Sequence, residues 1–192
     1  PLPNGSNYRT IARADGGSAG GLLTLTSDMA ETGMKPAWLG YFYADDVDAL
    51  CARAQTLGAT IAMPPTDLPA AGRIAMLIDP QGAAFYLIKP IPPEGQPDAQ
   101  SDVFASDVVG RCCWNELNAP DALAAIAFYS ELFDWSMDDG LPMPDGHVFR
   151  FIDIGGVRIG AVGERLKPGD RAAFTPYFRG ADIHAMADAV PA

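Results

Sequence analysis

Cysteine and histidine are scarce in this sequence, and their scarcity excludes the commonest nucleophilic and disulfide-based architectures. Three Cys occur among 192 residues, and Cys112 and Cys113 are adjacent. This set does not make a disulfide framework, and we expect buried structural thiols in a reducing compartment. There are two His, of which His147 follows a loop and His184 begins a helix. We expect surface roles for both, so a hydrolase triad has no support.

Positive charge and long apolar runs are also lacking. Thirteen Lys and Arg oppose twenty-four Asp and Glu, which gives a net charge of −11. Such a chain repels phosphate backbones and anionic lipid surfaces, so we expect neither nucleic acid nor membrane as a partner. No stretch approaches the roughly twenty apolar residues needed to cross a bilayer. The start resembles no export signal, although it lacks Met, and we expect a cytoplasmic protein.

The first half of the chain predicts the element order β-α-β-β-β. A strand over 38–44 precedes the cap pair Asp45 and Asp46, and an apolar period follows that indicates a helix ending at Gly58. A short strand is expected over 60–63, and then a Pro-rich loop. Strands over 73–78 and 83–89 flank the turn at 79–82.

A second module begins after a segment rich in proline. Residues 90–107 break the apolar periodicity and predict a linker. A strand over 111–118 follows, and Pro120 at a first helical position leads into a helix. Strands over 148–154 and 157–162 are expected to form a hairpin turned by Gly155 and Gly156.

The chain also contains an internal repeat. GYFYADDVDAL, from Gly40, aligns with PYFRGADIHAM, from Pro176, and a second block relates the glycines near Gly16 to those near Gly155. Two blocks in the same order indicate duplication. We therefore predict a first domain over 1–90 without its opening strand and helix, a linker over 91–107, and a second domain over 108–192 without its last strands.

Two longer runs carry a family resemblance. They are DDVDALCARAQTLGATIAMPPTDLPAAGRIAMLIDPQGAAFYLIKP and WNELNAPDALAAIAFYSELFDW. Both resemble modules of the glyoxalase/bleomycin-resistance/dioxygenase, or vicinal oxygen chelate, superfamily, in particular its two-domain glyoxalase- and hydroxylase-like branch. The resemblance implies an α+β fold of tandem βαβββ modules, with curved mixed sheets and helices on the outer face. A shared fold does not transfer a reaction.

The resemblance also locates the family's metal ligands. Members that bind a divalent ion use His, Glu or Gln on the first and last strands of a module. The matching positions here are Trp114, Leu39, Thr175 and Tyr86. None is a good ligand for such an ion, so we expect no metal site and no cofactor.

Strand alternation predicts which residues would line a pocket instead. With Trp114 facing inward, its neighbours two residues apart should do so as well, and the same holds for the related strands. The predicted lining is Trp114, Glu116, Asn118, Leu39, Tyr41, Tyr43, Tyr86, Thr175, Tyr177 and Arg179. An aromatic lining of this kind favours a small apolar or aromatic molecule. Glu116 is a weak candidate for a general base.

The sequence is compatible with three functions. The first is a metal-independent small-molecule binding protein. The second is a metal-dependent lyase, isomerase or dioxygenase of the glyoxalase type, with ligands in segments that this sequence lacks. The third is a structural or interaction module whose aromatic residues only fill a sheet interface. Exposed sheet edges would make homo-oligomerisation compatible with each.

Overall fold

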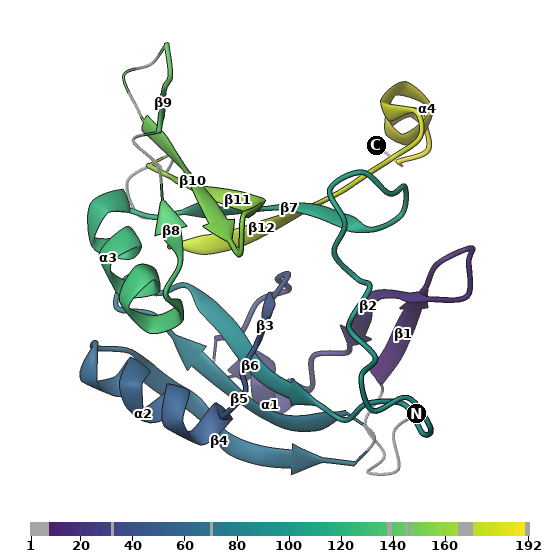
Figure 1. The fold of residues 1–192 in the computed structure, drawn as a ribbon, viewed down its shortest axis with the longest axis horizontal. Coiled ribbons are helices and arrows are strands. Elements are labelled where there is room, and N and C mark those ends of the chain that lie inside the picture. The colour runs from purple at the N-terminus through teal and green to yellow at the C-terminus, as the bar shows by residue number, and fades with distance from the viewer. Residues whose placement is uncertain are drawn as a thin grey trace. The chain divides into compact units, whose positions relative to one another are not determined.

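The computed structural model of the chain describes residues 8–31, 33–69, 71–137, 140–144, 146, 148–164 and 171–190. It divides the chain into two compact units (Figure 1). One contains residues 1–37, 100–113 and 177–192, and the other contains 38–99 and 114–176. The division of the sequence into domains at 1–90 and 108–192 stays a prediction.

The larger unit contains a four-stranded sheet whose order is β3-β6-β5-β4. The strands are β3 (Tyr41–Tyr43), β4 (Thr60–Leu68), β5 (Gly72–Ile78) and β6 (Ala84–Pro90), and helix α2 spans Val47–Thr56. Strands β3 and β6 are parallel, whereas the other two pairs are antiparallel. The predicted β-α-β-β-β order is therefore confirmed, and so is the α+β class with mixed sheets.

Strand β4 corrects one expectation from the sequence. The prolines after Met63 were expected to form a loop, yet β4 continues through Pro64 and Pro65 to Leu68. It lies at the edge of the sheet, and its register with β5 shifts on both sides of Met63. Proline lacks an N–H donor, but an irregular edge strand needs no donor on its outer side. Both prolines lie where the register shifts between Met63 and Thr66, so they fall in an irregular part of the edge strand.

A second mixed sheet has the order β12-β7-β11-β10-β8, with β9 paired to β10. Its strands are β7 (Cys112–Asn118), β8 (Ser136–Met137), β9 (Leu141–Pro142), β10 (Val148–Ile154), β11 (Val157–Gly163) and β12 (Ala173–Phe178). Helix α3 covers Ala122–Phe133. The hairpin between β10 and β11 turns at Gly155 and Gly156, as predicted, and both have the positive φ that a tight turn requires.

Three helices begin in the same way. The side chain of Asp46 accepts from the Ala49 N–H, and that of Asp121 accepts from the Ala124 N–H. Helix α4 (Ile183–Asp188) is capped by Asp182 in the same manner. Because Asp121 is the cap, Pro120 lies one residue before it and not at the first helical position, which corrects that prediction.

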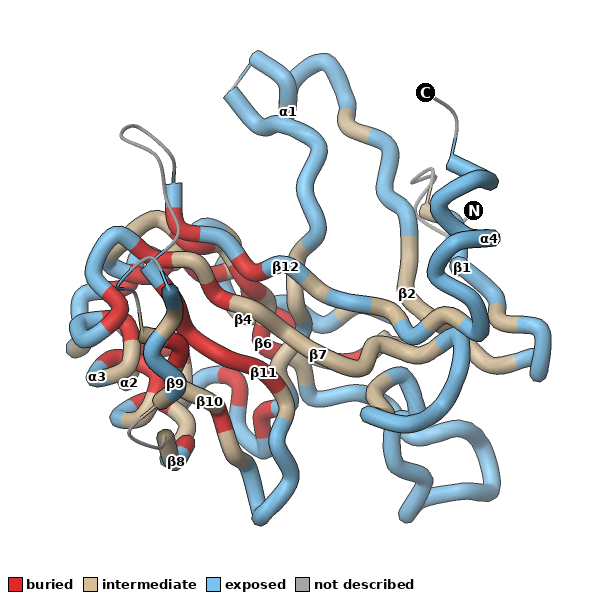
Figure 2. The backbone as a smooth tube through the Cα atoms, turned by 90° about the horizontal axis from the view of Figure 1, so that it is seen from above, coloured by how far each residue is buried: buried red, intermediate tan, exposed pale blue. Residues whose placement is uncertain are grey.

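The aromatic core of the larger unit joins both sheets. Tyr129 on α3 is fully buried, and its ring lies 5.8 Å from that of Phe85 on β6 and 5.4 Å from that of Phe174 on β12. The ring of Phe42 on β3 lies 5.2 Å from that of Phe174. Each such pair contributes about 0.5–1.5 kcal/mol beyond its buried area. One apolar cluster therefore stabilises the halves 38–99 and 114–176 together (Figure 2).

A buried carboxylate connects the two halves at one point. Asp79 is only 4% exposed, and its Oδ1 accepts hydrogen bonds from the backbone N–H groups of Gln81 and Ala83, each at 2.8 Å. Its Oδ2 accepts from the Tyr129 hydroxyl at 3.0 Å. Gln81 adds a reciprocal pair, since its side-chain amide bonds both the N–H and the carbonyl of Asp121. The turn at 79–82 is thus a joint between two modules.

The smaller unit consists of three separate stretches of chain. Its elements are the antiparallel pair β1 (Tyr8–Ala12) and β2 (Ser18–Leu23), the short helix α1 (Ser27–Glu31) and helix α4. Residues 13–17 connect β1 to β2 and include Gly16 at a positive φ, whereas Gly155 and Gly156 alone connect β10 to β11. Among the described residues, no helix is long and apolar enough to cross a membrane.

We expect Tyr129→Phe to destabilise the larger unit. The substitution keeps the ring but leaves Asp79 Oδ2 buried without its donor, which costs about 1–3 kcal/mol. Urea unfolding followed by circular dichroism measures the loss.

The control for this prediction is Tyr43→Phe, which removes a hydroxyl bonded to Asp45 at the surface and should change the unfolding midpoint very little. Equal midpoints for the two variants would contradict the structural role assigned to Asp79.

Candidate functional site

Strand β7 carries three of the predicted lining residues on one face. Leu117 is buried in the core, so its neighbours Glu116 and Asn118 point to the opposite side of the sheet together with Trp114. The Asn118 Nδ2 donates to Glu116 Oε1 at 3.1 Å, which orients the carboxylate. The alternation that predicted this face from sequence therefore holds along β7.

Strands β10 and β11 complete the same face. Phe151 pairs in register with Ala161, and Ala161 pairs with Glu116. The Phe151 ring meets the Trp114 indole edge-on, with centroids 5.9 Å apart. We call the surface made by Trp114, Glu116, Asn118, Phe149 and Phe151 the Trp114 face.

Small residues on β11 leave space for the larger side chains of this face. Ala161 and Gly163 lie beside Glu116 and Asn118 respectively. A Cβ on Gly163 would lie 2.8 Å from the Phe149 ring, so the ring rests directly over the glycine backbone. The Oδ1 of Asn118 is buried and has no hydrogen-bond partner within the described residues. The face thus combines aromatic side chains with one buried hydrogen-bond acceptor.

A cation borders the aromatic residues. The Arg158 guanidinium carbon lies 4.2 Å from the centroid of the Phe151 ring, within cation–π range. The same guanidinium holds both carboxylate oxygens of Asp153, at 3.2 and 3.1 Å. Arg158 therefore fixes Phe151 and is already neutralised by Asp153.

A second group of predicted residues lies on the first sheet. The rings of Tyr41 and Tyr86 stack with centroids 4.5 Å apart and planes 7° apart, and the two residues pair in register. Burial raises the pKa of Tyr86. The pKa of Tyr43 is raised mainly by its hydrogen bond to Asp45. We call the surface made by Tyr41, Tyr43 and Tyr86 the Tyr41 face.

The Trp114 and Tyr41 faces belong to different sheets. The core sides of both sheets, which carry Phe42 and Leu117, belong to one apolar cluster. Since side chains alternate along a strand, both faces point away from that cluster. The structure therefore brings the predicted residues together as two groups, and their role in lining a pocket stays a prediction.

The remaining predicted residues are Leu39, Thr175, Tyr177 and Arg179. Leu39 is half-buried just before β3, and Thr175 is exposed on β12, where it alternates with the buried Phe174. Tyr177 and Arg179 belong to the smaller unit, in which the backbone N–H of Arg179 donates to the Arg111 carbonyl and its Nη1 donates to the Ser106 carbonyl. Glu116, the candidate general base, lies on the Trp114 face beside Asn118.

Sequence reasoning missed Phe149, Phe151 and Arg158 as parts of the site. The signal was present, because Phe149 and Phe151 alternate along a predicted strand of the second module. The register between β10 and β7 through β11 was needed to place them beside Trp114. Of the two His, His184 is exposed as predicted, and His147 lies outside the described residues.

The donor set at the family's ligand positions does not fit a divalent ion. Trp114 and Leu39 carry no ligating atom, and Thr175 offers only a hydroxyl. The raised pKa of Tyr86 keeps its phenol protonated, which makes it a poor ligand. Within the described part of the chain, no three His, Cys, Asp or Glu side chains gather in a way that would hold a metal.

One hollow of about 410 Å³ lies where α2 begins and α3 ends. Its charged lining residues include Asp45, Asp46, Arg53 and Asp134, and Arg53 forms ion pairs with Glu131 and Asp134. Of the predicted lining residues, Tyr43 is the one that reaches it. The hollow is open, and its carboxylates already bond the Tyr43 hydroxyl, the Ala49 N–H and Arg53, so it favours no particular ligand.

Residues 6–87 fit the family described as Glyoxalase/Bleomycin resistance protein/Dioxygenase superfamily. A protein named "Putative glyoxylase CFP32" from Mycobacterium tuberculosis is 27% identical over 187 residues, which cover 97% of this chain and 68% of that protein.

Other relatives match a smaller part. The "Anthracycline biosynthesis protein DnrV" of Streptomyces peucetius is 37% identical over 97 residues, or 50% of this chain, and the chain spans 33% of its length. Among solved structures, a homoprotocatechuate 2,3-dioxygenase variant from B. fuscum matches with a TM-score of 0.48 and 15% identity, covering 65% of this chain and 36% of that one.

The cysteines provide a test of the local environments. Burial raises the pKa of Cys51 to about 11, with a smaller contribution from the nearby carboxylate of Asp48. Because the thiolate is the reactive form, we expect iodoacetamide at about pH 8 to modify Cys51 far more slowly than an unperturbed thiol. Peptide mass spectrometry after timed quenching measures the rate. In urea the difference should vanish, and rapid labelling of Cys51 in the folded protein would contradict its buried position.

Proposed function

Because this chain belongs to the glyoxalase/bleomycin resistance protein/dioxygenase superfamily, we propose that it binds a flat, apolar small molecule on the Trp114 face without a metal ion. Superfamily membership supports small-molecule binding or catalysis as the general activity. The observation that carries the narrower proposal is the Trp114–Phe151 aromatic pair beside the Glu116–Asn118 polar pair.

The composition of the Trp114 face sets the ligand class. Indole and phenyl rings contribute through area and stacking, which favours planar partners over flexible ones. The polar part is small, since the Asn118 amide donates to Glu116 and the Asn118 Oδ1 is itself buried. Two of the relatives are named for anthracycline biosynthesis, and anthracyclines contain fused aromatic rings.

The same residues support the proposal that no metal ion takes part. A vicinal oxygen chelate needs an ion with several oxygen or nitrogen ligands and open positions. At the corresponding positions this chain supplies an indole, an alkyl chain, a hydroxyl and a half-buried phenol. The binding energy must then come from the organic surface itself.

We expect Trp114→Ala to weaken the binding of the neutral planar probe N-phenyl-1-naphthylamine by about fivefold or more, because the indole is the largest contact on the face. Fluorescence titration measures the dissociation constant. The control is Leu123→Ala, which removes an exposed apolar side chain from α3 and should leave the constant unchanged. Equal affinities for the two variants would place the probe elsewhere.

The metal-dependent alternative makes a distinct prediction. After treatment with a chelator, the protein should retain its affinity for the probe, and dialysis against Zn²⁺ or Mn²⁺ should load no tightly held ion. Plasma mass spectrometry of the dialysed protein gives the ion content. One ion per chain, together with a change in probe affinity, would favour the enzymatic alternative.

A further inference from the structure

The smaller unit is assembled without a hydrophobic core. Every buried hydrophobic residue of the described chain belongs to the larger unit, and none lies in 8–31, 100–113 or 177–190. Its apolar side chains remain exposed, including Leu22, Leu23 and Val109. Figure 2 shows β1, β2 and α4 in the colours of intermediate and exposed residues. Something other than apolar burial must hold these three stretches together.

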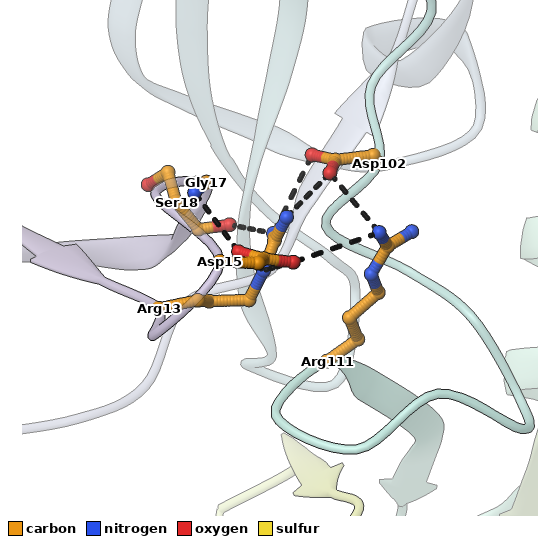
Figure 3. A network of polar contacts seen from close by, with 6 residues as sticks. All are labelled: Arg13, Asp15, Gly17, Ser18, Asp102 and Arg111. Carbon is orange, nitrogen blue, oxygen red and sulfur yellow. Dashed lines mark hydrogen bonds and ion pairs between the residues drawn. The ribbon is translucent and has the colours of Figure 1, made fainter.

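The most enclosed charged group of this unit is the guanidinium of Arg13. Its side chain is only 5% exposed. Its Nε donates to Asp15 Oδ1 at 3.1 Å, its Nη1 donates to the Ser18 carbonyl at 2.5 Å, and its Nη2 bonds Asp102 Oδ2 (Figure 3). One arginine thus joins both ends of the β1–β2 turn to a residue 89 positions away in sequence.

A second arginine closes the cluster. Arg111 Nη2 lies 3.3 Å from Asp102 Oδ2 and 3.9 Å from Asp15 Oδ2, so each carboxylate is shared by two guanidinium groups. The Arg111 carbonyl in turn accepts from the Arg179 N–H at 3.0 Å. Charge-assisted bonds of this kind are stronger than neutral ones, and a network costs less side-chain entropy than separate pairs. We call the set Arg13, Asp15, Asp102 and Arg111 the ionic clasp.

We infer that the smaller unit is a conditionally folded element held closed by the ionic clasp, which opens when its charges are screened while the aromatic core of the larger unit stays folded. The clasp joins Arg13 and Asp15 of the β1–β2 turn to Asp102 and Arg111, so its opening releases 100–113 from that turn. Screening acts on it because Asp15 and Asp102 are each about half exposed, at 53% and 52%. Apolar burial does not weaken with salt, so we expect the aromatic core of the larger unit to stay folded.

Acid should open the clasp as well. Hydrogen bonds from Gly17 and Arg13 lower the pKa of Asp15, and the bond from Arg13 lowers that of Asp102. A carboxyl group whose folded pKa is depressed contributes stability above its ordinary value of 3.8, and that stability is lost as the pH falls through the lower folded pKa. A further charged group, Arg179, contacts the segment 100–113, where its Nη1 donates to the Ser106 carbonyl. Opening is therefore expected below the ordinary aspartate range.

Amide hydrogen exchange of the whole chain tests the inference. We expect exchange in peptides covering 8–23 and 100–113 to speed up about tenfold or more on going to about 1 M NaCl, where the Debye length falls to about 3 Å. Peptides covering β5 and β6 should keep their protection. A uniform change in both units, or none in either, would overturn the inference.

Two variants open the clasp by different routes at low salt. Asp102→Asn removes the shared carboxylate charge. Gly17→Ala removes no charge, but its new Cβ would occupy the place of the Arg13 guanidinium and displace it. Both should reproduce the fast exchange of the salt experiment. The matched control is Asp107→Asn, which removes the same charge from an exposed position in the same segment and should exchange like the wild type.

The variants also separate the clasp from the proposed binding function. Neither Asp102 nor Gly17 lies on the Trp114 face, so affinity for N-phenyl-1-naphthylamine should not change in either variant. Wild-type exchange in both clasp variants would refute the clasp while leaving the binding proposal untouched. Fast exchange in Asp107→Asn as well would show that net charge, and not the clasp, holds the unit.

Discussion

The larger unit depends on satisfying one buried carboxylate between two modules. Asp79 is removed from water and needs all three donors that reach it, two from its own turn and one from Tyr129. An unpaired charge at such depth is very costly, so the turn and helix α3 must meet in one arrangement. That requirement also brings the Tyr129 ring against Phe85 and Phe174, and thereby fixes the aromatic core. The polar joint specifies which surfaces pack, and the apolar cluster supplies the stabilisation.

This constraint explains why the faces with functional potential point outward. Each sheet can bury one face in the shared core, and alternation then directs the other face away from it. Trp114 and Tyr41 are on such faces because Leu117 and Phe42 occupy the core side. The packing of the core thus sets the location of the candidate site.

Most of the local structure could be predicted from the sequence, because local chemistry decides it. The Asp46 cap, the glycine turn at 155–156 and the alternation along β7 were each visible in a few residues. The length of β4 was not, since proline is tolerated only where a strand lies at an edge, and edge position is a property of the whole sheet. Phe149 and Phe151 were missed for the same reason, because cross-strand register placed them beside Trp114. The pairing of Asp79 with Tyr129, fifty residues apart, was also beyond a local reading.

The repeat separates what a helix sequence determines from what its surroundings determine. Val47 of α2 is buried against the first sheet, whereas its counterpart in α4, Ile183, is 73% exposed. Both helices have the same type of cap and the same apolar spacing, so the difference lies in the strands that cover them. Without such cover, α4 has only local hydrogen bonds to hold it, and short helices are marginal on that basis. The smaller unit to which α4 belongs must therefore draw its order from contacts that need no apolar burial, and ion pairs are the strongest of these that it contains.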